Sequence, residues 1–271
     1  MQETLRHPHV AGHFYTAVPG RLRSEIEGYL GEPAAAKAKA YGVMVPHAGY
    51  LYSGAVCGHA LASVEIPGTV LILHTKHQVG GGKFSLAGFR EWETPLGKAP
   101  VDEQLETALA NVDGIDVSNL PHFNEHAAEV VLPFLQVLRP DVKICVISVS
   151  HAPYDELLSV ADGIAKAVLA HDGDDTLIVA SSDMNHYEDH HTTMEKDKLA
   201  LDKLTEYDTQ GMLEVCYSRD ISMCGVHATA LMLETCRQLG AGKVELLEHT
   251  TSGEVSGDMN QVVGYASARV L

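Results

Sequence analysis

The chain has 271 residues, of which 36 are acidic and 19 are basic, so its formal net charge is -17 and its isoelectric point is near 5.3. This acidic balance disfavours nucleic acid and anionic membranes as partners, and no run of about 18 apolar residues predicts a membrane span. The five cysteines form no CxxC pair and fit a reducing cytoplasm. No linker or repeat divides the sequence, so residues 1–271 are expected to form a single domain.

Strand-like and helix-like segments alternate along the chain. Apolar runs predict strands at 42–45, 69–73, 142–149, 176–180, 244–247 and 262–270. Apolar residues spaced by three and four predict helices at 21–30, 55–64, 125–138, 154–169, 193–207 and 226–239. This alternation indicates an α/β fold with a central, mostly parallel or mixed sheet and helices on both of its faces. The last strand is a candidate for antiparallel pairing at an edge, and the polar, Gly-rich segments 78–100 and 247–257 are expected to be long loops.

Ligand-type side chains follow three of the predicted strands. His47 comes after the first, His74 and His77 end or follow the second, and Asp183 and His186 follow the fourth. The carboxyl ends of parallel strands meet at one edge of a sheet, where α/β proteins build their sites, so these side chains are expected to converge. Each taken alone has an ordinary alternative, and Asp183 in particular is a candidate helix N-cap.

Two more histidines, His190 and His191, lie close to His186. Residues His186 and His190 have a spacing that suits zinc on a helix, but Tyr187 stands where a zincin motif requires Glu. We therefore interpret His190 and His191 as solvated residues.

Cys224 directly precedes the predicted helix 226–239, and the N-terminus of a helix lowers the pKa of a thiol. A buried apolar role is the alternative for Cys224 and the expectation for the other four cysteines. Glu125 opens another predicted helix, where a carboxylate favours the helix dipole, and the role of His126 stays open. The sequence has neither a phosphate-binding glycine motif nor a GxSxG elbow, so nucleotide binding and serine hydrolysis are not expected.

Together these motifs resemble the Memo family, also called protein B of the AmmeMemoRadiSam system. The family is similar in fold to class III extradiol dioxygenases, whose iron is held by two histidines and one carboxylate. The resemblance runs along nearly the whole chain, through Arg6 and residues 10–15, 45–54, 92–97, 125–135, 181–187, 224–225, 252–258 and 262–265.

The resemblance implies a metal pocket of two histidines and one cysteine, which fall on His47, His77 and Cys224. Asp183 and His186 match the neighbouring polar residues and are the expected catalytic groups. The family usually has Gly-Pro-Asn/Ser before its second histidine, whereas this chain has His74-Thr75-Lys76, which leaves His74 as a rival ligand. The family name also implies a functional link to radical-SAM and AMMECR-type proteins.

Imidazole and thiolate ligands suit iron(II), copper or zinc better than magnesium or calcium, and we expect iron(II) or copper rather than zinc. Two functions follow from this ligand set. The first is a metal-binding protein with a dioxygenase-like pocket and a redox or metal-handling role, whose partner is either a small molecule or a protein. The alternative is a metal-dependent oxidoreductase or dioxygenase acting on a small substrate, aromatic compounds included, in which Asp183 orients a ligand or water and His186 acts as acid or base.

Overall fold

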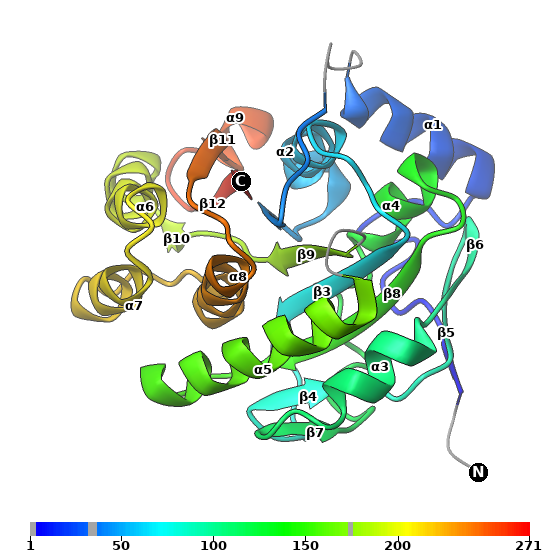
Figure 1. The fold of residues 1–271 in the computed structure, drawn as a ribbon. Helices are drawn as coiled ribbons and strands as arrows, with labels where there is room; N and C mark the ends of the chain where they lie inside the picture. Colours follow the sequence, from blue (N-terminus) through cyan, green and yellow to red (C-terminus); the bar gives the residue numbers. More distant parts are fainter. Residues whose placement is uncertain (1–3, 32–36, 173–175) are drawn as a thin grey trace.

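The computed structural model describes residues 4–31, 37–172 and 176–271, and it has the α/β fold that the sequence predicts. The main sheet runs in the spatial order β10, β12, β2, β9, β3, β8, β4, β7, with β11 beside β12 (Figure 1). At its centre β2, β9, β3 and β8 are parallel, whereas β12 joins β2 antiparallel. The strands of this sheet are β2 (Gly42–Val45), β3 (Thr69–Thr75), β4 (Phe84–Leu86), β7 (Ile115–Val117), β8 (Lys143–Val149), β9 (Thr176–Ser181), β10 (His186–Glu188), β11 (Val244–Thr251) and β12 (Val262–Val270).

A small second sheet is formed by β1 (Leu5–Arg6), β5 (Glu91–Thr94) and β6 (Gly97–Pro100). In this sheet β1 pairs parallel with β5, and β5 pairs antiparallel with β6. These strands bring the N-terminal segment, including the buried Arg6, next to the buried Trp92. The pairing therefore anchors the start of the chain to the body of the molecule.

Helices cover both faces of the main sheet (Figure 1). On one face α2 (Tyr50–Ala62) packs with α1 (Pro19–Leu30) and α4 (Leu132–Leu138), and on the other α8 (Val226–Gln238) packs with α5 (Tyr154–Asp172), which in turn contacts α3 (Glu103–Leu109). At the β10 and β12 end lie α6 (His190–Thr205) and α7 (Thr209–Ser218), and the short α9 (Gly253–Ser256) follows β11.

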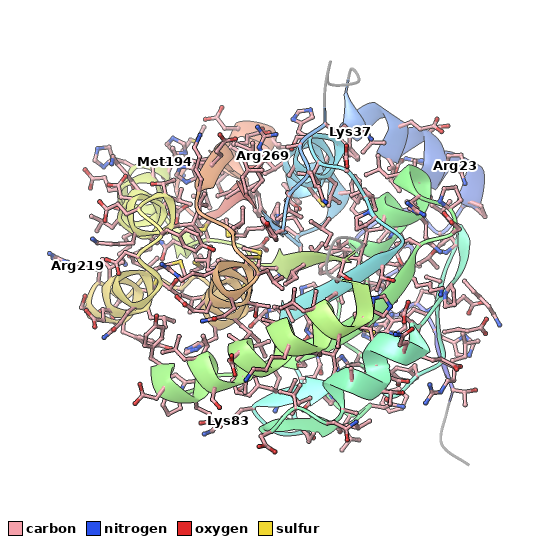
Figure 2. All side chains as sticks on the ribbon, viewed as in Figure 1. Arg23, Lys37, Lys83, Met194, Arg219 and Arg269 are labelled. Carbon is pink, nitrogen blue, oxygen red and sulfur yellow. The ribbon has the colours of Figure 1, made fainter. Side chains whose placement is uncertain are left out.

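Helix α8 is buried on every side. All of its residues from Val226 to Cys236 are buried, because the helix lies against β2, β3 and β9 while α5 and α7 cover it. Side chains fill the spaces between the layers in this way, whereas the labelled Arg23, Lys83 and Arg219 project outward (Figure 2). The start of α8 is therefore fixed firmly against the ends of the parallel strands.

Four sequence expectations about elements are wrong. The helix expected over 125–138 exists only as α4, since residues 127–131 form turns and Pro133 lies at the helix start, where proline is favoured. The expected loop 78–100 contains β4, β5 and β6, and the expected loop 247–257 contains the end of β11 and α9. Strand β12 does pair antiparallel, but it is not at an edge, because β11 and β10 pair with it as well as β2.

The described part of the chain has no helix that is both long and apolar enough to cross a membrane.

The five cysteines are free thiols, and four of them are buried: Cys57, Cys145, Cys216 and Cys236. These four have the apolar role that the sequence predicts.

Candidate metal centre

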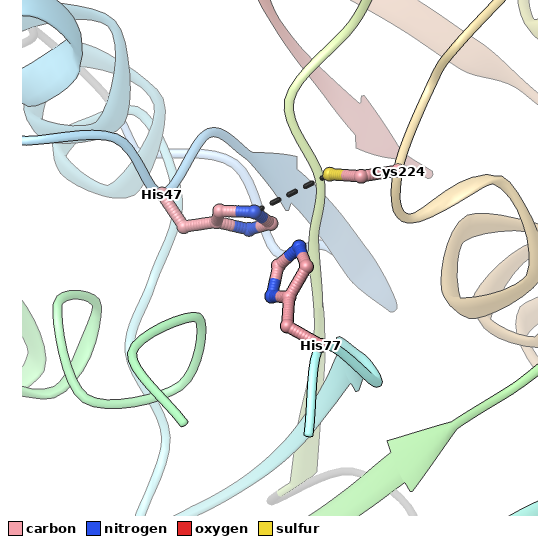
Figure 3. A group of neighbouring side chains, drawn as sticks. All are labelled: His47, His77 and Cys224. Carbon is pink, nitrogen blue, oxygen red and sulfur yellow. Dashed lines mark hydrogen bonds between the residues drawn. The ribbon is translucent and has the colours of Figure 1, made fainter. Parts of the chain in front are cut away.

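Two histidines and one cysteine meet at the carboxyl edge of the parallel strands. His47 and His77 each lie two positions beyond the ends of β2 and β3, and Cys224 lies two positions before α8. One ligand atom from each of the three residues lies within 4.8 Å of the others, and His47 Nε2 is 3.3 Å from Cys224 Sγ. Figure 3 shows the three side chains pointing toward one another. The structure thus brings together the three residues that the family resemblance implied.

Hydrogen bonds fix the tautomer of His47. Its Nδ1 lies 2.8 Å from Ser181 Oγ, and the Ser181 hydroxyl donates to the carbonyl of Ala127 at 2.6 Å, so it accepts a proton from His47. Nε2 consequently carries the lone pair on the side of Cys224. Burial and, to a smaller extent, the neighbouring His77 lower the pKa of His47 to about 3, so the ring is neutral at physiological pH.

His77 presents the same nitrogen. Its Nδ1 donates to Glu125 Oε1 at 2.9 Å, which leaves Nε2 as the nitrogen with a lone pair. Although burial opposes protonation, the hydrogen bond to Glu125 raises the pKa of His77. Histidine ligands in metal proteins ordinarily have such a partner on the second ring nitrogen, because it fixes the orientation of the ring.

Glu125 is the functional residue that the sequence reasoning missed, since only a helix-dipole role was expected for it. Its side chain is fully buried and accepts hydrogen bonds from the backbone amides of His77, His126 and Ala127 as well as from the His77 ring. Burial alone would raise its pKa, but the bond from His77 and the nearby His74 hold the pKa well below its ordinary value. Glu125 is therefore an ionised group that holds His77 in place.

The expectation of a lowered Cys224 pKa is wrong for the protein without metal. Burial raises the pKa of this thiol well above its ordinary value, and the carboxylate of Asp183 adds to the effect. The loop itself is well anchored, because Thr75 Oγ1 donates to the carbonyl of Cys224 at 2.7 Å and the amide of Gly225 donates to Ser182 Oγ at 2.9 Å. The thiol is thus held in position and keeps its proton.

The rival residue His74 lies outside the cluster. Its side chain is fully buried, its Nδ1 bonds to the carbonyl of Thr75 at 2.7 Å, and its Nε2 lies 3.0 Å from Nδ1 of His122. Both ring nitrogens are therefore engaged away from His47 and Cys224.

Asp183 and His186 lie beside the cluster. Asp183 Oδ1 accepts the amide proton of His47 at 2.8 Å, and Oδ2 is 3.9 Å from His47 Nε2. Burial raises the pKa of Asp183. No helix follows this residue directly, since β10 comes next, so the N-cap alternative is wrong. His186 Nδ1 donates to the carbonyl of Ser222 at 2.9 Å, which leaves its Nε2 as an acceptor.

The His190 and His191 pair lies apart from this site. The His191 side chain is 81 % exposed, as expected for a solvated residue. His190 is less exposed than expected, because it begins α6 and its Nδ1 lies 2.9 Å from Thr251 Oγ1. His186 and His190 belong to different elements, so they do not share a helix face.

A cavity of about 670 Å³ opens above the three ligands. Its polar side chains include Asp183, His186 and His126, and the ring of His126 stacks on His77 with centroids 4.8 Å apart. Its apolar walls come from Phe14, Tyr187, Val263 and Tyr265. Among the described residues no lysine or arginine lines the cavity. The arrangement offers room for a small molecule next to a site with imidazole and thiol ligands.

These features define an α/β protein with a candidate transition-metal site at one end of its parallel strands. The family model described as Memo-like protein matches residues 6–269, and the chain belongs to this family. It is 38% identical to a MEMO1 family protein of Sulfolobus acidocaldarius, over 98% of this chain and 99% of that protein. A MEMO1 family protein of Methanopyrus kandleri is also 38% identical, over 97% of each chain.

The fold also has a counterpart among solved structures. An uncharacterised protein from Escherichia coli K12 superposes with a TM-score of 0.55 at 11% identity, covering 85% of this chain and 99% of that one. At this identity the likeness concerns the fold alone.

Proposed function

We propose that this protein binds iron(II) or copper through His47, His77 and Cys224 and serves a redox or metal-handling role. The observation that carries the proposal is the convergence of three ligand atoms within 4.8 Å of one another. Two imidazoles and one thiolate are ligands of intermediate to soft character, which suit these metals better than magnesium or calcium.

The residues around the ligands support this role. Ser181 and Glu125 hold the two rings so that Nε2 of each is available, and Cys224 binds as a thiolate after giving up its proton. The bound metal would supply Lewis-acid or one-electron chemistry. Asp183, which accepts the amide proton of His47, holds the His47 backbone in place.

The test is metal retention after anaerobic reconstitution with Fe(II) and, separately, with Cu(I). We expect the wild-type protein to retain stoichiometric metal and His47→Ala to lose it. His191→Ala is the matched control, since this histidine is exposed and belongs to no ligand cluster. Wild-type protein that retains no more of either metal than His47→Ala would contradict the proposal.

The second candidate function is a metal-dependent oxidoreductase, and the cavity favours it because a small substrate fits beside the ligands. In this function Asp183 orients a ligand or water, and His186 accepts or returns a proton at Nε2. Oxygen uptake by Fe(II)-loaded protein with catechol and protocatechuate tests this candidate. Turnover that is lost in His186→Ala while metal is retained would favour it, and absence of turnover across a broad substrate panel would contradict it.

A further inference from the structure

Two fully buried histidines face each other behind the candidate metal centre. His74 lies in β3 and His122 lies in the turn that leads to Glu125, and neither side chain is exposed. The Nε2 atom of His74 is 3.0 Å from the Nδ1 atom of His122, which is a hydrogen-bond distance.

The outer nitrogens of the two rings are both donors. His74 Nδ1 lies 2.7 Å from the carbonyl oxygen of Thr75, and His122 Nε2 lies 3.0 Å from the carbonyl oxygen of Ser85. A carbonyl only accepts, so each of these nitrogens carries a hydrogen. If both rings were neutral, the inner nitrogens would have only lone pairs and would repel each other across 3.0 Å. The contact becomes a hydrogen bond only when one further proton lies between the rings.

The buried charges around the pair also favour a cation there. Glu125 accepts only from N–H groups. Glu129 likewise accepts only from donors, namely the guanidinium of Arg6, the amides of His9 and Val10, and the hydroxyl of Tyr15. Both are therefore carboxylates.

One guanidinium lies between the segments that carry these two carboxylates and pairs with one of them. Arg6 pairs with Glu129 and donates to the backbone carbonyls of His122 and Glu125. Two further titratable groups lie against Glu125: His77, whose ring donates to it, and His126, whose Nδ1 is 3.4 Å from Oε1. With both of these rings neutral, the cluster of Arg6, Glu125 and Glu129 has one uncompensated negative charge, and burying such a charge is costly.

We propose that His74 and His122 share one proton and form a buried cation at neutral pH. Burial lowers the pKa of each ring, and the charges of Arg6 and of neighbouring histidines lower it further. The 3.0 Å contact between the inner nitrogens and the carboxylate of Glu125 favour one added proton on the pair. The shared proton neutralises Glu125, the residue that orients His77. This proton site is present whether or not a metal binds, so it does not depend on the proposed function.

The test is ¹⁵N NMR of metal-free protein labelled at histidine, recorded between about pH 6 and 8. The ring signals of His74 and His122 are assigned in the wild type by through-bond NMR correlations that start from the Cβ atom of each residue. We expect the outer nitrogens to be protonated and the inner nitrogens to show the signals of a shared proton throughout this range. Two inner nitrogens with the signals of bare lone pairs would overturn the proposal.

His122→Asn provides a second measurement. The asparagine amide donates to Nε2 of His74 without an extra proton, so His74 should become neutral and its Nε2 should show the signal of a nitrogen with a lone pair. His59→Asn is the control, since His59 is exposed and bonds to Glu248, and it should leave both rings unchanged. A protonated His74 in folded His122→Asn would overturn the proposal, and the wild-type spectra decide the matter if this variant does not fold.

Discussion

Replacing Glu125 by Gln should weaken metal binding without removing any ligand. Glutamine keeps the shape of the side chain, but an NH₂ group replaces one of the two carboxylate oxygens. If it replaces Oε2, it faces the His77 backbone amide, which in the wild type lies 2.9 Å from Oε2. If it replaces Oε1, it faces the donors that bond to Oε1, among them the His77 ring. Two hydrogen-bond donors then face each other in a fully buried position. Leaving a buried donor unsatisfied costs about 1–3 kcal/mol of stability. Loss of the partner that orients a ligand histidine typically weakens metal affinity by about 10- to 100-fold, or about 1.4–2.7 kcal/mol.

Glu129→Gln is the matched control for this change. Glu129 is also buried and also accepts from four donors, but it contacts neither His47 nor His77 nor Cys224. Urea unfolding should show both variants to be destabilised, whereas competition with a chelator should show lower metal affinity for Glu125→Gln alone. Equal affinity losses in the two variants, or wild-type affinity in folded Glu125→Gln, would refute the reasoning.

Three further predictions concern the ligands and the fold. Metal titration should show a severe loss for His77→Ala and a smaller one for His74→Ala, and the reverse order would make His74 the ligand. Because the pKa values of Cys224 and His77 are both raised, metal binding between about pH 6 and 8 should release at least one proton and tighten at least about tenfold per pH unit; an affinity independent of pH would contradict this. Asp102 caps α3 and its folded-state pKa is lowered by hydrogen bonds that outweigh its burial. Its stabilisation is therefore present above the unfolded pKa of about 3.9 and is lost as the pH falls through the folded pKa. Urea unfolding of Asp102→Ala should show a deficit of about 0.5–2 kcal/mol at pH 7 that shrinks by pH 3.

The sequence predicts the centre of the fold well, because the runs that become β2, β3, β8 and β9 are mostly apolar and are buried almost throughout. The positions of His47 and His77 follow from the ends of two of these runs. Short strands such as β4 and β6 were missed, since three or four residues contain too little periodicity.

The features of the site that the sequence does not predict depend on contacts between residues distant in the chain. Glu125 accepts a hydrogen bond from the ring of His77, which lies 48 positions earlier in the chain, and no local pattern encodes this pairing. The raised pKa of Cys224 likewise depends on burial and on Asp183, 41 positions earlier, which outweigh the local effect of a helix N-terminus. Local sequence therefore identifies the candidate ligands but not the groups that control them.

The order in which the ligands occur along the chain has a consequence for biosynthesis. Cys224 follows His47 by 177 positions, and β2, the strand that leads into His47, pairs with β12, which ends one residue before the last described residue. During synthesis, the third candidate ligand and the pairing strand therefore become available long after His47 and His77. A nascent chain stalled before residue 224 has only two of the three candidate ligands, so the proposed three-ligand site cannot form on it.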